Sequence, residues 1–150
     1  MHIVLVHPDI PQNTGNIGRL TLGIGAKLHL VKPLGFDISE KAVRRAGLDY
    51  WKEVDLEIHE SVDDFLRWAE GRQVSILSTK SKQSLVQAKF QPDTVLVFGS
   101  ETQGLPPIFH EKFVGYTIPM KNKIRSYNLA NSVAITAYFA LHQIHPDWLQ

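Results

Sequence analysis

The chain has 150 residues, of which 43% are hydrophobic and 21% charged, and its formal net charge is +1. This length and apolar share predict one compact domain spanning the whole chain and argue against a disordered protein. The sequence contains no cysteine, which excludes disulfides, thiolate metal sites and a cysteine nucleophile and fits a cytoplasmic protein.

Short apolar runs recur along the chain and predict strands over residues 3–6, 28–31, 74–77, 95–98 and 116–118. Several runs are apolar at consecutive positions, which is typical of strands covered on both faces. The first run is too short for a signal peptide and lacks its basic flank. No apolar stretch approaches the roughly 18 residues that indicate a membrane span. We therefore expect a protein that does not insert into membranes.

Helical segments are predicted between these runs, over residues 14–24, 61–68, 108–112 and 128–143. Ser61 is a good N-cap for the second of them. Apolar residues surround most of the last helix, which predicts burial on two sides, the second side being a partner subunit or the core of a monomer. Alternating strands and helices predict an α/β fold, with a mainly parallel sheet and helices on both faces. Ligands of such sheets bind beyond the carboxyl ends of the strands.

The loop after the first strand leads into a helix that Asn13 or Thr14 can cap. The free N–H groups of that helix would form an anion site, and Arg19 lies about one turn further on. The alternative is a capped helix with one exposed arginine. After the strand at 95–98, Gly99 and Gly104 flank Glu101, which favours a ligand site over a plain turn.

Basic residues cluster after the last strand, where Lys121, Lys123 and Arg125 precede Ser126 and Asn128. Lysine and arginine neutralise phosphates, so this segment favours RNA binding, although a solvated loop and a helix cap are the alternatives. Dehydrogenase and nucleotide triphosphate chemistry lose support, because neither a dinucleotide fingerprint nor a P-loop is present. His142 and His145 have a spacing that could bind a metal, but no carboxylate partner is evident, and we expect no metal site.

Three segments together resemble the motifs of the SPOUT RNA 2′-O-methyltransferases, in both order and spacing. They are Asn-Thr-Gly-Asn-Ile-Gly-Arg at 13–19, Phe-Gly-Ser-Glu-Thr-Gln-Gly-Leu-Pro at 98–106, and Ile-Pro-Met at 118–120 with Ser-Tyr-Asn-Leu-Ala-Asn at 126–131. The resemblance extends over nearly all of the chain. Arg-Arg-Ala-Gly-Leu-Asp-Tyr at 44–50 is further similar to the minimal branch that modifies the wobble nucleotide of tRNA. The departures are Gly18, Ser100 and Tyr127, where a larger apolar residue, proline and methionine are common.

The resemblance implies a C-terminal trefoil knot and a homodimer formed through the C-terminal helix. It also implies transfer of a methyl group from S-adenosyl-L-methionine to the ribose 2′-oxygen of the wobble cytidine or modified uridine of tRNA, in leucine isoacceptors, with S-adenosyl-L-homocysteine as product. Another tRNA position or rRNA is an alternative target. A catalytically silent RNA-binding module is the alternative from another class.

Roles follow from the resemblance by position. Arg19, Ser126 and Asn128 are the expected catalytic residues. The residues expected to bind the cofactor are Leu77, Ser78, Thr79, Gly99, Glu101, Gly104, Ile118, Met120, Ser126 and Leu129. The residues expected to bind RNA are Asn13, Asn16, Arg44, Arg45, Lys121, Lys123 and Arg125.

Overall fold

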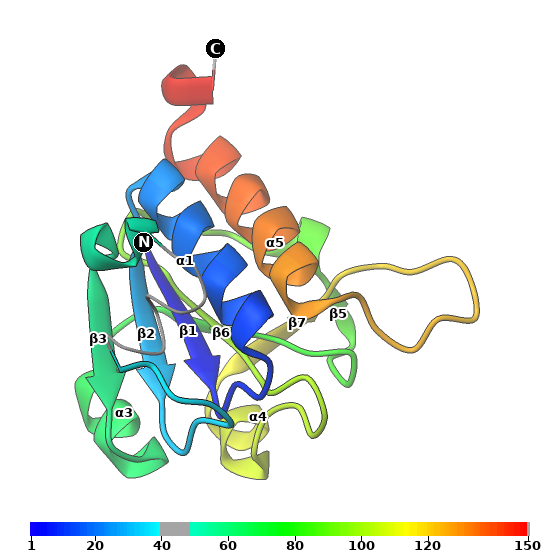
Figure 1. Ribbon diagram of the computed structural model, residues 1–150. Helices are drawn as coiled ribbons and strands as arrows, with labels where there is room; N and C mark the ends of the chain where they lie inside the picture. Colours follow the sequence, from blue (N-terminus) through cyan, green and yellow to red (C-terminus); the bar gives the residue numbers. More distant parts are fainter. Residues whose placement is uncertain (40–48, 150) are drawn as a thin grey trace.

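The computed structural model describes residues 1–39 and 49–149, which are built around one parallel sheet (Figure 1). Its strands lie in the order β3-β2-β1-β6-β4-β7-β5. Every pairing between neighbouring strands is parallel. The bounds are β1 (His2–Val6), β2 (Lys27–Val31), β3 (Leu56–His59), β4 (Val74–Leu77), β5 (Gln83–Ser84), β6 (Val95–Phe98) and β7 (Val114–Thr117). The predicted α/β class is confirmed.

Helices cover both faces of this sheet because the side chains of its strands alternate. In β1, Ile3 and Leu5 point to one core, which α1 (Pro11–Ile24) and α5 (Leu129–Ile144) close. These two helices lie side by side in Figure 1. Val4 and Val6 point to the other core, which contains Phe65 of α3 (Val62–Trp68) and, from α4 (Pro107–Lys112), Phe109.

Two strands were not predicted, β3 and β5, and both lie at the edges of the sheet. The two-residue β5 is too short to give a pattern. The run Leu-Glu-Ile-His of β3 alternates over only four residues. Short 3-10 helices were likewise not predicted; they are η1 (Asp49–Glu53), η2 (Leu85–Gln87) and η3 (Pro146–Leu149). Edge elements this short carry little periodicity, so sequence patterns miss them.

Helix α1 begins earlier than predicted and without a side-chain cap. Its first residue is Pro11, and its N-cap is Ile10 rather than Asn13 or Thr14, so that prediction is wrong. Proline starts a helix readily, because its missing N–H would have no partner there anyway. Asn13 is therefore inside the first turn, with its side chain free to reach other loops. Gly25 ends the helix in the left-handed conformation.

The cap predicted for α3 is confirmed, because Ser61 accepts a hydrogen bond from the Asp64 N–H. Helix α5 is capped by Asn128 and buries Val133, Ala137 and Ala140 against the sheet. Its other face exposes Ile135 and Tyr138, which are 42% and 62% accessible. The chain thus buries one side of α5 and leaves apolar residues on the second.

In the described parts of the chain, no helix combines the length and the apolar character that crossing a bilayer requires.

Candidate active site

A cavity of about 640 Å³ opens where β4, β6 and β7 end. Because the strands are parallel, the loops that follow them meet at one edge of the sheet, as expected of ligand sites in this architecture. The residues predicted to bind the cofactor all line it: Leu77, Ser78, Thr79, Gly99, Glu101, Gly104, Ile118, Met120, Ser126 and Leu129.

The loop after β6 is a tight turn that requires glycine at two positions. The Gly104 N–H donates to the Ser100 carbonyl at 3.0 Å, and the Ser100 N–H donates back to the Gly104 carbonyl at 3.3 Å. A Cβ at Gly99 would lie 2.2 Å from the carbonyl carbon of Gly104. Gly104 itself has φ +72°, in the left-handed region. These two glycines therefore let the loop fold back on itself beside the cavity.

Glu101 joins this loop to the one that follows β1. Its carboxylate accepts hydrogen bonds from the backbone N–H groups of Asp9 at 2.8 Å and Ile10 at 3.2 Å, and from Asn13 Nδ2 at 3.0 Å. Thr102 adds a bond from its hydroxyl to the Asp9 carboxylate at 2.6 Å. Glu101 lines the cavity, but both of its oxygens are already engaged by the neighbouring loop.

Asn128 joins the third segment to the same network. Its Nδ2 donates to Asn13 Oδ1 at 3.0 Å, while its Oδ1 accepts from the N–H groups of Ala130 and Asn131 at the start of α5. Hydrogen bonds thus connect Glu101 to Asn13 and Asn13 to Asn128, with one residue from each of the three predicted segments. Asn128 has both roles considered for it, a helix cap and a residue of the site. Ser126 lies beside it in the lining.

Arg19 does not line the cavity of its own chain. It is exposed on α1, and its guanidinium carbon lies 5.9 Å from the centre of the Tyr50 ring. The Tyr50 hydroxyl donates to the Gly15 carbonyl at 2.8 Å, which fixes the ring against α1. Burial raises the pKa of Tyr50. The aromatic ring therefore holds Arg19 at the surface, in a cation–π contact.

The residues predicted to bind RNA are only partly brought together. Arg125 lines the cavity, and Lys121 and Lys123 are exposed on the same loop. Asn16 is exposed on α1, whereas Asn13 is 5% accessible and is held by the network described above. Arg44 and Arg45 lie outside the described residues.

His110 in α4 is a lining residue that the sequence did not single out. Its Nε2 is buried and has no hydrogen-bond partner within the described residues. A buried polar atom without a partner is uncommon, which sets His110 apart among the lining residues. No sequence signal could have identified it, because one histidine in a short helix has no distinctive spacing.

The chain is similar to known proteins over most of its length. A model of the SpoU rRNA Methylase family matches residues 1–138. The chain is 42% identical over 144 residues to the tRNA (cytidine(34)-2'-O)-methyltransferase of Methylovorus glucosotrophus, covering 94% of each chain. It is 42% identical to the protein of the same name from Acidovorax sp. strain JS42, covering 95% of this chain and 91% of that one.

Solved structures have the same fold. One, described as giving structural insights into the 2-OH methylation of C/U34 on tRNA, superposes with a TM-score of 0.89 at 43% identity and covers 95% of this chain and 94% of that one. The SpoU methyltransferase AviRb of Streptomyces viridochromogenes, in complex with the cofactor AdoMet, superposes with a TM-score of 0.82. It is only 22% identical, and the match covers 95% of this chain and 57% of that one, so this likeness concerns the fold alone.

Proposed function

Since the chain belongs to the SpoU rRNA methylase family, we propose that it transfers a methyl group from S-adenosyl-L-methionine to the ribose 2′-oxygen of nucleotide 34, the wobble position of tRNA. The observation that carries this proposal is the convergence of three strand-end loops on one cavity, tied together by Glu101, Asn13 and Asn128. The names of relatives about 42% identical support the substrate. S-adenosyl-L-homocysteine is then the second product.

The cavity fits a cofactor of this kind. Its volume of about 640 Å³ lies within the roughly 300–1,000 Å³ range of small-molecule sites. Loop backbone at Leu77, Gly99 and Ile118 would supply hydrogen bonds to an adenine. When bound, S-adenosyl-L-methionine supplies a methyl group on a positively charged sulfur, which is ready for direct transfer to an oxygen.

Residues of the chain would then align the ribose and stabilise charge on its oxygen. Direct transfer needs no covalent intermediate with the enzyme, so alignment and electrostatics would carry the catalysis, and the proton of the 2′-hydroxyl would pass to an RNA phosphate or to water. Ser126 and Asn128 line the cavity, so they would lie beside a cofactor bound there. Arg19 remains protonated in proteins and is a poor base, so we assign it to the RNA phosphate and the developing oxyanion. Because it lies outside the cavity of its own chain, it would act at the cavity of the partner subunit in the homodimer proposed below.

RNA binding would rest on a local basic surface, because the net charge of the chain is only +1. Lys121, Lys123 and Arg125 lie on the loop that borders the cavity, where they can meet the phosphates that flank the target nucleotide. Each neutralised phosphate releases counterions, so the affinity for tRNA should fall steeply with salt. An affinity that ignores salt would contradict this assignment.

We further propose that the chain acts as one methyltransferase domain, in a cytoplasmic homodimer that pairs through α5. The exposed apolar residues Ile135 and Tyr138 on that helix support the pairing, since a partner would remove them from water. Sedimentation of the wild-type chain and of an Ile135→Glu/Tyr138→Glu variant tests it. We expect a dimer and a monomer, respectively.

The experiment that tests the reaction combines labelled S-adenosyl-L-methionine, the protein and total tRNA, followed by mapping of ribose methylation. We expect one methyl group on nucleotide 34 of leucine isoacceptors. Methylation elsewhere in tRNA, or in rRNA, would replace the substrate but keep the chemistry. Absence of both methyl transfer and cofactor binding would leave an RNA-binding module instead.

A further inference from the structure

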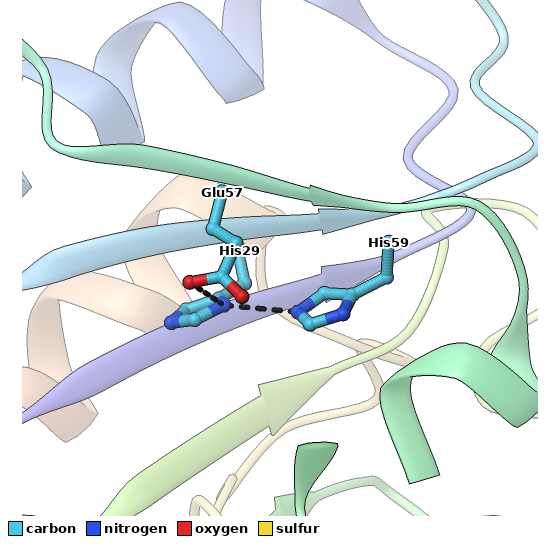
Figure 2. Close-up of side chains that lie close together, drawn as sticks. All are labelled: His29, Glu57 and His59. Atoms are coloured by element: carbon cyan, nitrogen blue, oxygen red, sulfur yellow. Dashed lines mark hydrogen bonds and ion pairs between the residues drawn. The ribbon is translucent and has the colours of Figure 1, made fainter. Parts of the chain in front are cut away.

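A second group of ionisable side chains lies on the other side of the sheet, away from the cavity. It consists of His29 in β2 with Glu57 and His59 in β3 (Figure 2). None of the three belongs to the cavity lining. The sheet register pairs His29 with Glu57 and Val31 with His59, so all three side chains point to the face that α3 covers.

The potential ligand atoms of these side chains converge. His29 Nδ1 and His59 Nε2 are 3.0 Å apart, and Glu57 Oε2 lies 3.9 Å from His29 Nδ1. One ligand atom from each residue lies within 4.8 Å of the others. Around a tetrahedral Zn²⁺ with bonds of about 2.0–2.2 Å, neighbouring ligand atoms are roughly 3.3–3.5 Å apart. Two of the observed separations, 3.0 and 3.9 Å, lie within about half an ångström of that value, and the three side chains in Figure 2 face one another, so side-chain adjustment is enough to bring them onto one ion.

The outer nitrogens of both imidazoles have partners that suit this role. His29 Nε2 lies 2.9 Å from His2 Nδ1, which can accept a hydrogen bond from the Nε2–H group and so favours the tautomer in which His29 Nδ1 is unprotonated. His59 Nδ1 faces Asp64 Oδ2 at 3.8 Å. Such contacts orient histidine ligands in metal sites and fix their tautomers. The residues that make these contacts are His2 of β1 and Asp64 of the first turn of α3.

Packing holds the two imidazoles in place. His29 is 0% and His59 3% accessible, and their rings stack at 5.3 Å with an angle of 15°. The Trp68 ring lies against both, at 4.4 Å from His29 and 5.5 Å from His59. Buried, immobilised donors lose little conformational freedom when they bind an ion. Glu57, whose side chain is 32% accessible, gives the site an approach from solvent.

Lys27 is the one cation within ion-pair distance of this group among the described residues, with Nζ 2.9 Å from Glu57 Oε2. It would have to release that oxygen. Asp55 offers it a second carboxylate, already 3.8 Å from the same Nζ and 70% exposed. The side chain of Lys27 is itself a third exposed, so the change of partner is a surface rearrangement that costs little.

We propose that His29 Nδ1, His59 Nε2 and the Glu57 carboxylate form a binding site for a divalent transition-metal ion, with Zn²⁺ as the best match. Two imidazoles and one carboxylate are ligands that Zn²⁺ accepts, and they leave one position for water on the exposed Glu57 side. The ion would join the edge strand β3 to β2. It contributes to stability and takes no part in methyl transfer.

The test uses the tag-free full chain, stripped with a chelator, and follows titration with Co²⁺ by visible absorption and with Zn²⁺ by calorimetry. We expect one ion per chain and a higher unfolding temperature in excess Zn²⁺. Glu57→Gln keeps the size of the partly exposed side chain and should weaken binding at least tenfold. His59→Gln removes a second ligand, and where it folds it should abolish the Co²⁺ spectrum.

Two matched variants keep the result specific. Asp63→Asn removes an exposed carboxylate of α3 that is neither a ligand nor a partner of Lys27, and His142→Gln removes a histidine from the distant α5. Both should bind as the wild-type chain does. The proposal is overturned if the wild-type chain takes up no ion at micromolar to millimolar concentration. It is also overturned if Glu57→Gln binds unchanged, or if binding disappears in His142→Gln.

Discussion

Replacing Glu101 by glutamine tests whether the three loops of the cavity are held together as described. The carboxylate accepts three hydrogen bonds, from the N–H groups of Asp9 and Ile10 and from Asn13 Nδ2. The glutamine amide has only one accepting oxygen. Its NH2 group would face a backbone N–H that the second carboxylate oxygen now accepts from, and two donors cannot bond to each other. One bond to a charged group, contributing roughly 1.5–3 kcal/mol, is lost, and the others become neutral and weaker.

Because these bonds are partly exposed to solvent, we expect Glu101→Gln to lower the free energy of unfolding by about 2 kcal/mol. In urea this corresponds to a midpoint lower by about 1 M at an unchanged slope. Glu111→Gln, on the exposed side of α4, is the matched control and should leave the midpoint within error. Methyl transfer should fall as well, since Asn13 and Asn128 lose their alignment. Equal midpoints for the wild type and Glu101→Gln would refute the reasoning.

Three further changes test other contacts. Gly99→Ala should weaken S-adenosyl-L-methionine binding at least tenfold by calorimetry, because its Cβ would lie 2.2 Å from the Gly104 carbonyl carbon, whereas Gly23→Ala has open space and should not. Gly18→Leu should destabilise the chain by about 1–3 kcal/mol in urea, since a Cβ there would lie 2.6 Å from the Trp51 ring, and adding Trp51→Ala should recover part of the loss. In chelator-treated protein, acid should destabilise the fold through His29. Burial lowers the pKa of this residue from 6.5 to about 3, and the positive charges of His2 and His59 lower it further in the same direction. Below pH 6.5 the unfolded chain gains a proton on this residue that the folded chain does not, so urea unfolding should show a loss of about 2 kcal/mol between pH 7 and pH 5. Stability that is flat over this range would contradict the burial argument.

The sequence predicted the location of the cavity well, because parallel strands bring the residues that follow them to one edge. The predicted runs end at Leu77, Phe98 and Ile118, and in a parallel sheet the residues that follow them lie at the same edge. The resemblance supplied the residue roles within those loops. It did not indicate that the Glu101 carboxylate is occupied by the β1–α1 loop, because that depends on the direction of two N–H groups in a loop without a repeating pattern.

Gly18 illustrates a departure from the family pattern that the structure explains. At position 18, where the motif that this segment resembles has a larger apolar residue, the described fold places the Trp51 ring against α1. The tryptophan fills the space that a side chain at position 18 would occupy. No pattern along the sequence links these positions, because η1 and α1 are separated along the chain and come into contact only in the folded structure. The trefoil knot, implied by the resemblance alone, is likewise beyond the reach of periodicity.

The cluster of His29, Glu57 and His59 could not be predicted from the sequence either, because its residues also meet only in three dimensions. His29 and His59 are separated by 30 positions and belong to no spacing typical of metal ligands. They meet because β2 and β3 pair in one particular register, and β3 was not predicted at all. A shift of that register by one residue would turn Glu57 and His59 to the opposite face. A bound ion at these residues would therefore favour the observed register over its neighbours, which is a reason for an edge strand of only four residues to contain both a histidine and a carboxylate on its buried face.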